Sequence, residues 1–460
     1  MNRDSTTALH ASGHRFLVRR MEYALACRDT RMLEDPIRAQ SLALAAGAVL
    51  TVIAVGISMA LAVIRPHGTI GSAPIVIARE SGAIYVQVGD TLHPAMNLAS
   101  ARLIAGSPAT PEMVSGASIA AAKRGSLMGI PGAPETLPTM TAGTAAWTVC
   151  DGEVTTVSVG AAREDPVAPP LLVRPAGDSA AIVYLVYDGR RALVDLRDRV
   201  VVRALRLDGV EPRRVSRVAL NLLPEGAPIR APVIDKAGTP GPSQLPGSRV
   251  GTILQVRRAD AAPDHYVVLA SGIQRVGPVA ADLVRFAVAQ TDPIREVPAD
   301  RIADVPVVES LPLRHLPQNS ATPIGNQLTA PVCVRWEPRE VGTAPEVTVT
   351  TAKSSPPQTP PVTLAQGDGD GPHLDAVVVP NGAFVHATGA AGAGAANGPL
   401  FFVDQEGVAY GVDGPETARS LGLPDTPGSG PWPVLAELPR GPALSAADAS
   451  VQRDGIPPPA

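Results

Sequence analysis

The stretch from Ser41 to Ile64 constrains this chain more than any other feature, because it holds no charged residue and lies between Arg38 and Arg65. An α-helix rises about 1.5 Å per residue, so these residues reach roughly 36 Å, enough to cross a hydrocarbon core about 30 Å thick. The stretch starts too late and runs too long for a cleavable signal peptide, and a buried helix of a soluble protein keeps a polar face. It therefore predicts one membrane-spanning helix, residues 41–64.

Basic residues are distributed unequally around this stretch. Seven arginines precede it, and the nearest bases that follow it are Arg65 and Arg79. Cytoplasmic flanks of membrane helices are rich in Lys and Arg, so we expect a cytoplasmic N-terminus and a periplasmic body on a single-pass protein of the inner (plasma) membrane. The body carries 32 basic and 38 acidic residues, and the whole chain has three lysines, so nucleic acid is not an expected partner.

The three cysteines separate across the predicted membrane. Cys27 precedes the span, on the side where thiols stay reduced, while Cys150 and Cys333 follow it, on the side where disulfides persist. A Cys150–Cys333 disulfide is the economical interpretation, and two unrelated buried thiols are the alternative. In the chain-entropy model a loop of this length contributes at most about 5 kcal/mol.

Residues 12–27 predict an amphipathic helix ahead of the span, with Ser12 as its N-cap. The apolar stripe consists of Leu17, Met21 and Leu25, and the charged face of Arg15, Arg19 and Glu22. Such a cationic helix could lie on anionic lipid or dock on a cytoplasmic partner, and the pattern leaves both open.

Four segments beyond the span share one pattern: an apolar run, a polar turn ending in Gly, a second run, and a helix with an Arg near its end. They are residues 75–106, 183–205, 266–286 and 400–423, with turn glycines Gly82, Gly189, Gly272 and Gly407 and arginines Arg102, Arg203, Arg285 and Arg419. Glycine suits a tight turn that needs φ > 0. We predict four strand-turn-strand-helix repeat modules, although this order of elements is common in α+β proteins. Their uneven spacing argues against a solenoid.

The intervals between these segments contain further β-like runs, and a Cys150–Cys333 bridge would tie two of them into one central β-sheet domain. The predicted fold class is therefore a single-pass membrane protein with an α+β periplasmic region, in which four small repeat modules surround a central β-sheet domain. The 48 Pro and 43 Gly indicate many turns and linkers. The predicted parts are 1–40 (cytoplasmic segment), 41–64 (span), 65–125, 176–208, 261–303 and 374–430 (modules 1 to 4), 126–175, 209–260 and 304–350 (central β domain), 351–373 (linker) and 431–460 (C-terminal docking segment and tail).

No catalytic motif stands out. The phosphate loop G-x-x-x-x-G-K-[ST] is absent, since Lys123, Lys236 and Lys353 all lack its flanking residues, and H-E-x-x-H, C-x-x-C and G-x-S-x-G are absent as well. The histidines of the body are scattered singly rather than spaced as metal ligands. We therefore predict no catalytic, cofactor-binding or metal-binding residues.

Several stretches together resemble the EccB family, the single-span component of type VII (ESX) secretion systems. They are SGHRFLVRRMEYAL and DTRMLEDP before the span, then GDTLHPAMNLASARLIAG, GIPGAP, WTVCDG, GVAYGVDGPETARSLGL and GPALSAADA after it. Their order, the position of the span and both outer cysteines agree with the family.

This resemblance implies a structural core component for protein export, which anchors an oligomerising periplasmic scaffold to a cytoplasmic motor. The implied partners are the motor ATPase EccC, the membrane components EccD and EccE, the lipid membrane and further copies of the chain in a hexamer. The helix at 12–27 is then a docking element for EccC and EccD, with Arg15, Phe16, Arg19, Arg20 and Met21 as its contact residues.

Two alternatives accompany the resemblance. Family members are also named ATPases, which would make ATP a cofactor, whereas the missing phosphate loop argues against intrinsic hydrolysis and for no cofactor. The repeat modules resemble phage cell-wall-binding domains, which adds peptidoglycan as a possible ligand.

Overall fold

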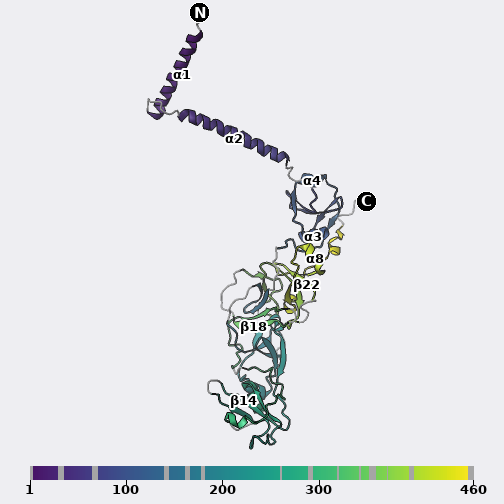
Figure 1. The fold of residues 1–460 in the computed structure, drawn as a ribbon. Coiled ribbons are helices and arrows are strands. Elements are labelled where there is room, and N and C mark those ends of the chain that lie inside the picture. The colour runs from purple at the N-terminus through teal and green to yellow at the C-terminus, as the bar shows by residue number, and fades with distance from the viewer. Residues whose placement is uncertain are drawn as a thin grey trace, which may run out of the picture. The chain divides into compact units, whose positions relative to one another are not determined.

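A computed structural model describes residues 4–28, 36–64, 71–138, 145–160, 166–177, 182–258, 262–288, 294–318, 321–340, 343–351, 359–369, 371–392 and 398–453. The chain divides into two compact units, one formed by residues 1–71 with the short stretch 114–118, and one formed by the rest of the chain (Figure 1). The first unit holds two long helices, and the second holds five β-sheets. The chain is thus an α+β protein in which several sheets follow an N-terminal apolar helix in sequence.

The first helix, α1 (Asp4–Cys27), begins earlier than the sequence predicted. Ser12, expected as its N-cap, lies in the helix interior, and its hydroxyl donates a hydrogen bond to the carbonyl oxygen of Leu9 at 3.0 Å. That prediction was wrong because a serine can satisfy its hydroxyl on the preceding turn, and Ala8 and Leu9 are good helix formers.

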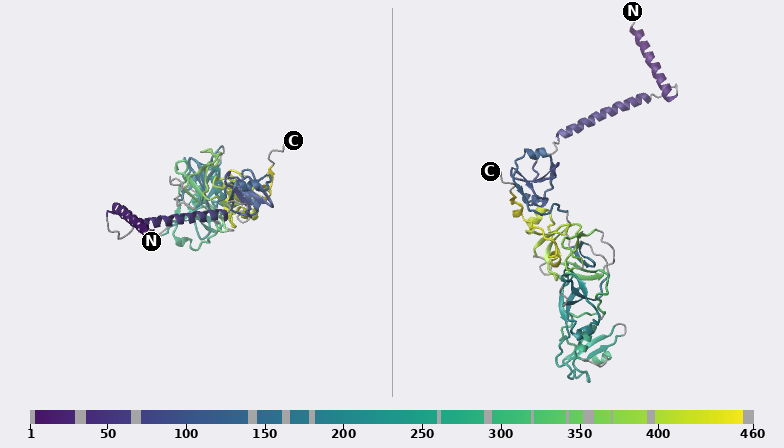
Figure 2. Two further views of the ribbon diagram at one scale, coloured as in Figure 1. Left: turned by 90° about the horizontal axis from the view of Figure 1, so that it is seen from above. Right: turned by 180° about the vertical axis from the view of Figure 1, so that it is seen from behind.

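The second helix, α2 (Pro36–Ile64), contains the apolar stretch and is continuous in every view (Figure 2). Proline is favoured in the first turn of a helix, where its missing N–H removes no hydrogen bond, so Pro36 is well placed at the start. Residues Gln40–Ala60 are long and apolar enough to cross a membrane, and none of them is buried in the structure. In the part of the chain that the structure describes, it is the one helix with these properties.

The central sheet contains six strands in the order β18-β17-β6-β7-β20-β19. The strands are β18 (Glu346–Thr351), β17 (Val332–Glu337), β6 (Ala146–Asp151), β7 (Thr155–Gly160), β20 (Ala376–Val378) and β19 (Val362–Thr363). β6 and β17 pair antiparallel, and their register places Cys150 opposite Cys333 and Trp147 opposite Trp336. The apolar side chains of these strands face one large core.

A second six-stranded sheet has the order β25-β5-β3-β2-β1-β4. Its strands are β25 (Gln452–Arg453), β5 (Leu127–Met128), β3 (Thr91–Ala95), β2 (Ile84–Val88), β1 (Ile75–Ala78) and β4 (Glu112–Val114), and the associated helices are α3 (Leu98–Ala105) and α4 (Gly116–Ala121). Because β25 pairs with β5, the C-terminal segment returns to the first sheet of the body.

The next sheet along the chain has the order β11-β8-β9-β10-β12. Its elements are β8 (Leu171–Pro175), β9 (Val183–Tyr187), β10 (Arg190–Val194), α5 (Arg199–Ala204), β11 (Arg213–Val215), α6 (Arg217–Leu222) and β12 (Glu225–Ile229). It is followed by the sheet β15-β14-β13-β16, formed by β13 (Ile253–Val256), β14 (Asp264–Leu269), β15 (Gly272–Val276), α7 (Pro278–Ala287), β16 (Arg295–Glu296) and the 3-10 helix η1 (Ala299–Ile302).

The last sheet has the order β23-β22-β21-β24. Its elements are β21 (Ala383–Thr388), β22 (Leu400–Val403), β23 (Ala409–Val412), α8 (Gly414–Leu421), β24 (Gly428–Pro431) and α9 (Trp432–Leu435), followed by α10 (Ala446–Ala449). Helices join the sheets in pairs, because α3 packs on α8, α5 packs on α7 and α6 packs on α9.

The structure differs from several of the predicted boundaries. The strand β8, in the predicted central interval 126–175, pairs with β9, whereas β19 of the predicted linker 351–373 and β20 of the predicted module 374–430 belong to the central sheet. The interval 209–260 contributes no strand to the central sheet, since β11 and β12 join β8–β10, and β13 joins β14. An apolar alternation identifies a strand but does not specify its partner. In the first segment the predicted turn at Gly82 joins β1 to β2. The hairpin directly before α3 is instead β2–β3, which turns after Val88, so the predicted strand-turn-strand-helix order was placed one strand too early.

Two hairpin turns pack against the central sheet. Gly189, between β9 and β10, has φ +68°, and a Cβ atom there would lie 2.0 Å from the carbonyl oxygen of Val347 in β18. A Cβ atom on Gly407, between β22 and β23, would lie 2.4 Å from the side chain of Val377 in β20. These two glycines therefore permit close contact as well as a left-handed turn.

We expect Gly189→Ala to destabilise the body by clearly more than Gly209→Ala. Gly209 has a similar φ of +72° but no atom within 4 Å of its Cβ position, so its substitution costs only the backbone strain of about 1–2 kcal/mol. Alanine at 189 adds a clash with a backbone carbonyl that no rotamer change relieves. Urea titration of both full-length variants, followed by tryptophan fluorescence, measures the difference. Equal losses would show that the contact with β18 is unimportant.

Candidate functional site

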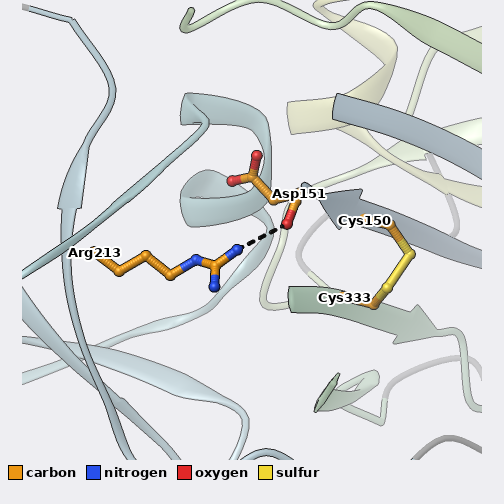
Figure 3. The surroundings of a disulfide bond; sticks show 4 residues. All are labelled: Cys150, Asp151, Arg213 and Cys333. Atoms are coloured by element: carbon orange, nitrogen blue, oxygen red, sulfur yellow. Dashed lines mark hydrogen bonds between the residues drawn. A yellow bond between two sulfur atoms is a disulfide. The ribbon is translucent and has the colours of Figure 1, made fainter. Parts of the chain in front are cut away.

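The described residues contain no group of three or more His, Cys, Asp or Glu side chains that could hold a metal ion. The middle of the central sheet instead joins several parts of the body. Cys150 and Cys333 form a disulfide there, with their Cα atoms 4.0 Å apart and a sequence separation of 183 residues (Figure 3). The disulfide decides between the two alternatives that the cysteine pattern left open. The side chain of Cys27 lies outside the described residues.

Asp151 follows Cys150 and connects the central sheet to the sheet that contains β8. Its Oδ2 accepts a hydrogen bond from the backbone N–H of Ser216 at 2.6 Å, and its Oδ1 accepts one from the hydroxyl of Thr155 at 3.1 Å. Ser216 is the N-cap of α6, so the carboxylate holds the start of this helix. Burial raises the pKa of Asp151, although the hydrogen bonds and the nearby Arg213 oppose this effect.

Arg213 of β11 completes the connection. Its guanidinium donates hydrogen bonds to the carbonyl oxygens of Leu328, of Ala330 at 2.9 Å and of Asp151 at 3.3 Å (Figure 3). Leu328 and Ala330 precede β17, the strand of Cys333, whereas Asp151 ends β6, the strand of Cys150. The side chain of Arg213 therefore binds the backbone close to both cysteines. Burial lowers the pKa of Arg213, and Asp151 opposes this shift. An arginine stays charged in proteins, so the guanidinium keeps its five donors.

The two tryptophans of the central sheet connect it to the sheet that contains β21. Trp147 and Trp336 are fully buried opposite each other. The indole N–H of Trp147 donates to the carbonyl oxygen of Ser429 at 3.1 Å, and that of Trp336 donates to Ala390 at 3.0 Å. Because buried indole N–H groups need acceptors, these bonds fix where β24 and the chain after β21 lie against the sheet.

The recurring arginines divide into two kinds. Arg102 on α3 donates to the carbonyl oxygen of Leu421 at 2.7 Å and so caps the C-terminal end of α8, a favourable place for a cation. The guanidinium of Arg203 on α5 lies 4.6 Å from the ring centre of Phe286 on α7. Arg285 directly precedes Phe286 in sequence and lies over the same ring. Arg419 is exposed. The pairs α3–α8 and α5–α7 are therefore each joined by the arginine of the earlier helix.

The predicted docking residues all lie on α1. Arg15, Phe16, Arg19, Arg20 and Met21 have exposed side chains, with Phe16 56% and Met21 65% exposed. Their role in docking stays a prediction.

The sequence did not single out Asp151 or Arg213. Asp151 stands next to Cys150 in the stretch WTVCDG, and that proximity was the one available signal. Arg213 has no pattern of its own, since its three acceptors are backbone carbonyls that only the fold brings together.

The sequence matches the family described as "Type VII secretion system ESX-1, transport TM domain B" over residues 3–458. It is 34% identical to the ESX-3 secretion system ATPase EccB3 of Mycolicibacterium smegmatis, over 99% of this chain and 92% of that protein. It is also 34% identical to the ESX-2 secretion system ATPase EccB2 of Mycobacterium tuberculosis, over 97% of this chain and 94% of that protein.

Two solved structures are similar along most of the chain. A chain in the structure of an intact ESX-5 inner membrane complex has a TM-score of 0.70 and 30% identity, covering 98% of this chain and 96% of that one. The structure of an EccB3 dimer from the ESX-3 core complex has a TM-score of 0.70 and 31% identity, covering 82% of this chain and 100% of that one.

The raised pKa of Asp151 predicts an unusual pH dependence. A carboxyl whose pKa is raised by folding binds its proton more tightly in the native state, so its contribution to stability grows as the pH falls from neutral toward about 4. Relative to Asp151→Asn, the full-length wild type should therefore gain unfolding free energy across this range, measured by urea titration at several pH values.

Asp195→Asn is the matched control. Hydrogen bonds from Arg197 lower the pKa of Asp195, so the advantage of its carboxylate should be constant above about pH 4 and decline only below it. Parallel pH profiles for wild type and Asp151→Asn would contradict the role given to the burial of Asp151.

Proposed function

The chain belongs to the EccB family of type VII secretion systems, and from that premise we propose that it is a structural core component of a type VII secretion membrane complex. The family match extends over nearly the whole chain, and a similar chain is part of an intact ESX-5 inner membrane complex. The organisation of the chain fits this role: one exposed apolar helix, a charged helix before it and a large body after it.

The disulfide supports the proposed membrane topology. A Cys150–Cys333 bond needs an oxidising compartment, which argues for a periplasmic body. The arginines that precede α2 argue for a cytoplasmic N-terminus. Together they support a single pass through the inner membrane, with α1 inside and the body outside.

We propose further that the four outer sheets are copies of one repeat module around the central sheet. In support, three sheets have three consecutive antiparallel strands, a helix, and a later strand that pairs in parallel with the first of the three, as β11 pairs with β8, β16 with β13 and β24 with β21. In the fourth, β4 lies next to β1 in the same position. A shared order of this kind is more than a common α+β outline requires.

The body is then the oligomerising scaffold. A relative has been solved as an EccB3 dimer, and this supports self-association of the present chain. We propose that six such chains form a hexamer, which assembles with EccC, EccD and EccE. Because α1 lies next to the span in sequence, we propose that it is the element that contacts the cytoplasmic motor.

A second candidate function is nucleotide hydrolysis, because the related EccB3 and EccB2 proteins are named secretion system ATPases. The sequence of the present chain lacks the phosphate loop, and its three lysines stand outside any glycine-rich motif. We favour the structural role, with no cofactor, and treat ATP as a ligand only under this alternative. Peptidoglycan binding by the modules rests on the resemblance alone and can be tested by pelleting with insoluble cell wall.

We expect the purified full-length chain to release no phosphate from ATP above the background of an identically purified empty membrane fraction. The physical reason is that the sequence lacks the glycine-rich loop and lysine that cradle the phosphates of a nucleotide in P-loop proteins. A malachite-green assay measures the release. Turnover that co-elutes with the chain and is abolished by one substitution in the body would instead establish the hydrolase.

The docking proposal predicts that combined Arg15→Glu, Arg19→Glu and Arg20→Glu substitutions release EccC and EccD from the complex. Reversing three charges on one exposed helix should reduce their recovery in a pull-down on the body by about tenfold, a loss of roughly 1.4 kcal/mol or more. Arg197→Glu with Arg199→Glu, on exposed positions of the body, is the control. Unchanged recovery with the helix variant, or after deletion of residues 12–27, would disprove the docking role.

A further inference from the structure

Trp432 has an exposed aromatic side chain in a body that otherwise covers its aromatic rings. The chain is only 3% aromatic, and Trp147 and Trp336 are fully buried with their indole N–H groups bonded. Trp432 is 45% exposed, and every other aromatic side chain of the described body is buried or partly buried. Exposing an indole costs hydrophobic stabilisation unless a partner covers it.

Trp432 belongs to a compact cluster with Phe401 and Arg440. The ring centres of Trp432 and Phe401 are 6.1 Å apart at an angle of 44°. The guanidinium of Arg440 lies 5.0 Å from the Phe401 centre and 5.2 Å from the Trp432 centre. Arg440 is exposed, and it forms no ion pair within the described part of the chain. Tryptophan and arginine are the side chains most enriched at the energetic centres of protein interfaces.

The cluster stands on a rigid base. Trp432 is the first residue of α9, and Val434 and Leu435 of the same helix are fully buried in the central core. α9 packs on β21, β24 and α6, so the position of the indole is set before any partner arrives. Preorganisation of this kind lowers the entropy lost on binding.

We propose that this cluster is the anchor of a contact between two copies of the chain related by a two-fold axis. A two-fold interface uses the same patch on both copies, so the patch must contain its own complement. Trp432 supplies a π face and Arg440 a cation, and Glu437, three residues earlier, supplies a carboxylate. Across the axis, Arg440 of one copy meets Trp432 and Glu437 of the other, a cation–π contact beside an ion pair.

This proposal rests on the self-association included in the proposed function and names the surface that produces it. The other exposed apolar side chains of the described body, such as Val233 and Val307, are not aromatic, so they cannot take part in a cation–π contact. The cluster also lies on the sheet whose helix α8 packs on α3, so the anchor is tied to the part of the body that follows the membrane helix.

Sedimentation velocity of the full-length chain in density-matched detergent tests the contact. Trp432→Ala and Arg440→Glu should each weaken self-association by about 30-fold, as expected for a central interface residue. The double variant Arg440→Glu with Glu437→Arg should recover most of the loss, because the swapped charges again face each other across the axis. Val307→Ala and Arg197→Glu are exposed control variants that should not change the association constant.

A cross-linking experiment is independent of affinity. In a Cys27→Ser background, Trp432→Cys should form a disulfide-linked dimer under mild oxidation, whereas Val307→Cys should not. A wild type that stays monomeric would reject self-association itself. A wild type that associates, with Trp432→Ala unchanged and Trp432→Cys not cross-linked, would reject only this anchor and indicate another surface or another partner for the cluster.

Discussion

The antiparallel pairing of β6 with β17 is the interaction on which the rest of the body depends. These strands are about 180 residues apart in sequence, so their pairing carries a large loop-closure entropy that few contacts could offset alone. The Cys150–Cys333 bond removes much of that cost from the unfolded state, and the opposed tryptophans bury a large apolar area next to it. Once the pair exists, the chain between the strands is held as one loop that carries two whole sheets.

Two of the remaining sheets, those that contain β8 and β21, are attached to this pair by polar groups with few alternatives. Asp151 and Arg213 bind backbone groups on one side, and the two indole N–H groups bind carbonyl oxygens on the other. Hydrogen bonds of such partly buried groups add little net energy when formed, but they are costly to leave unmade, so they specify geometry more than stability. A structural core component of a secretion membrane complex benefits from this specificity.

Sequence patterns were reliable where a single physical property decides the outcome. Absence of charge over one stretch was enough to identify α2, and the Gly of a tight turn together with two apolar runs located three of the four hairpins. The patterns failed where several local solutions have similar energy. Ser12 can cap a helix or bond to the preceding turn, and the strands of 209–260 can pair with any open edge.

The amino-acid sequence was sufficient to establish one apolar helix of membrane length, a basic segment before it, and an α+β body with two cysteines in strand-like runs. These features depend on composition and short-range periodicity. The tertiary structure alone decided which strands share a sheet, that Asp151 and Arg213 join the chain on both sides of the disulfide, and that Trp432 is exposed beside Arg440. Those features depend on contacts between residues that are far apart in sequence, and only the packing of the whole body selects among them.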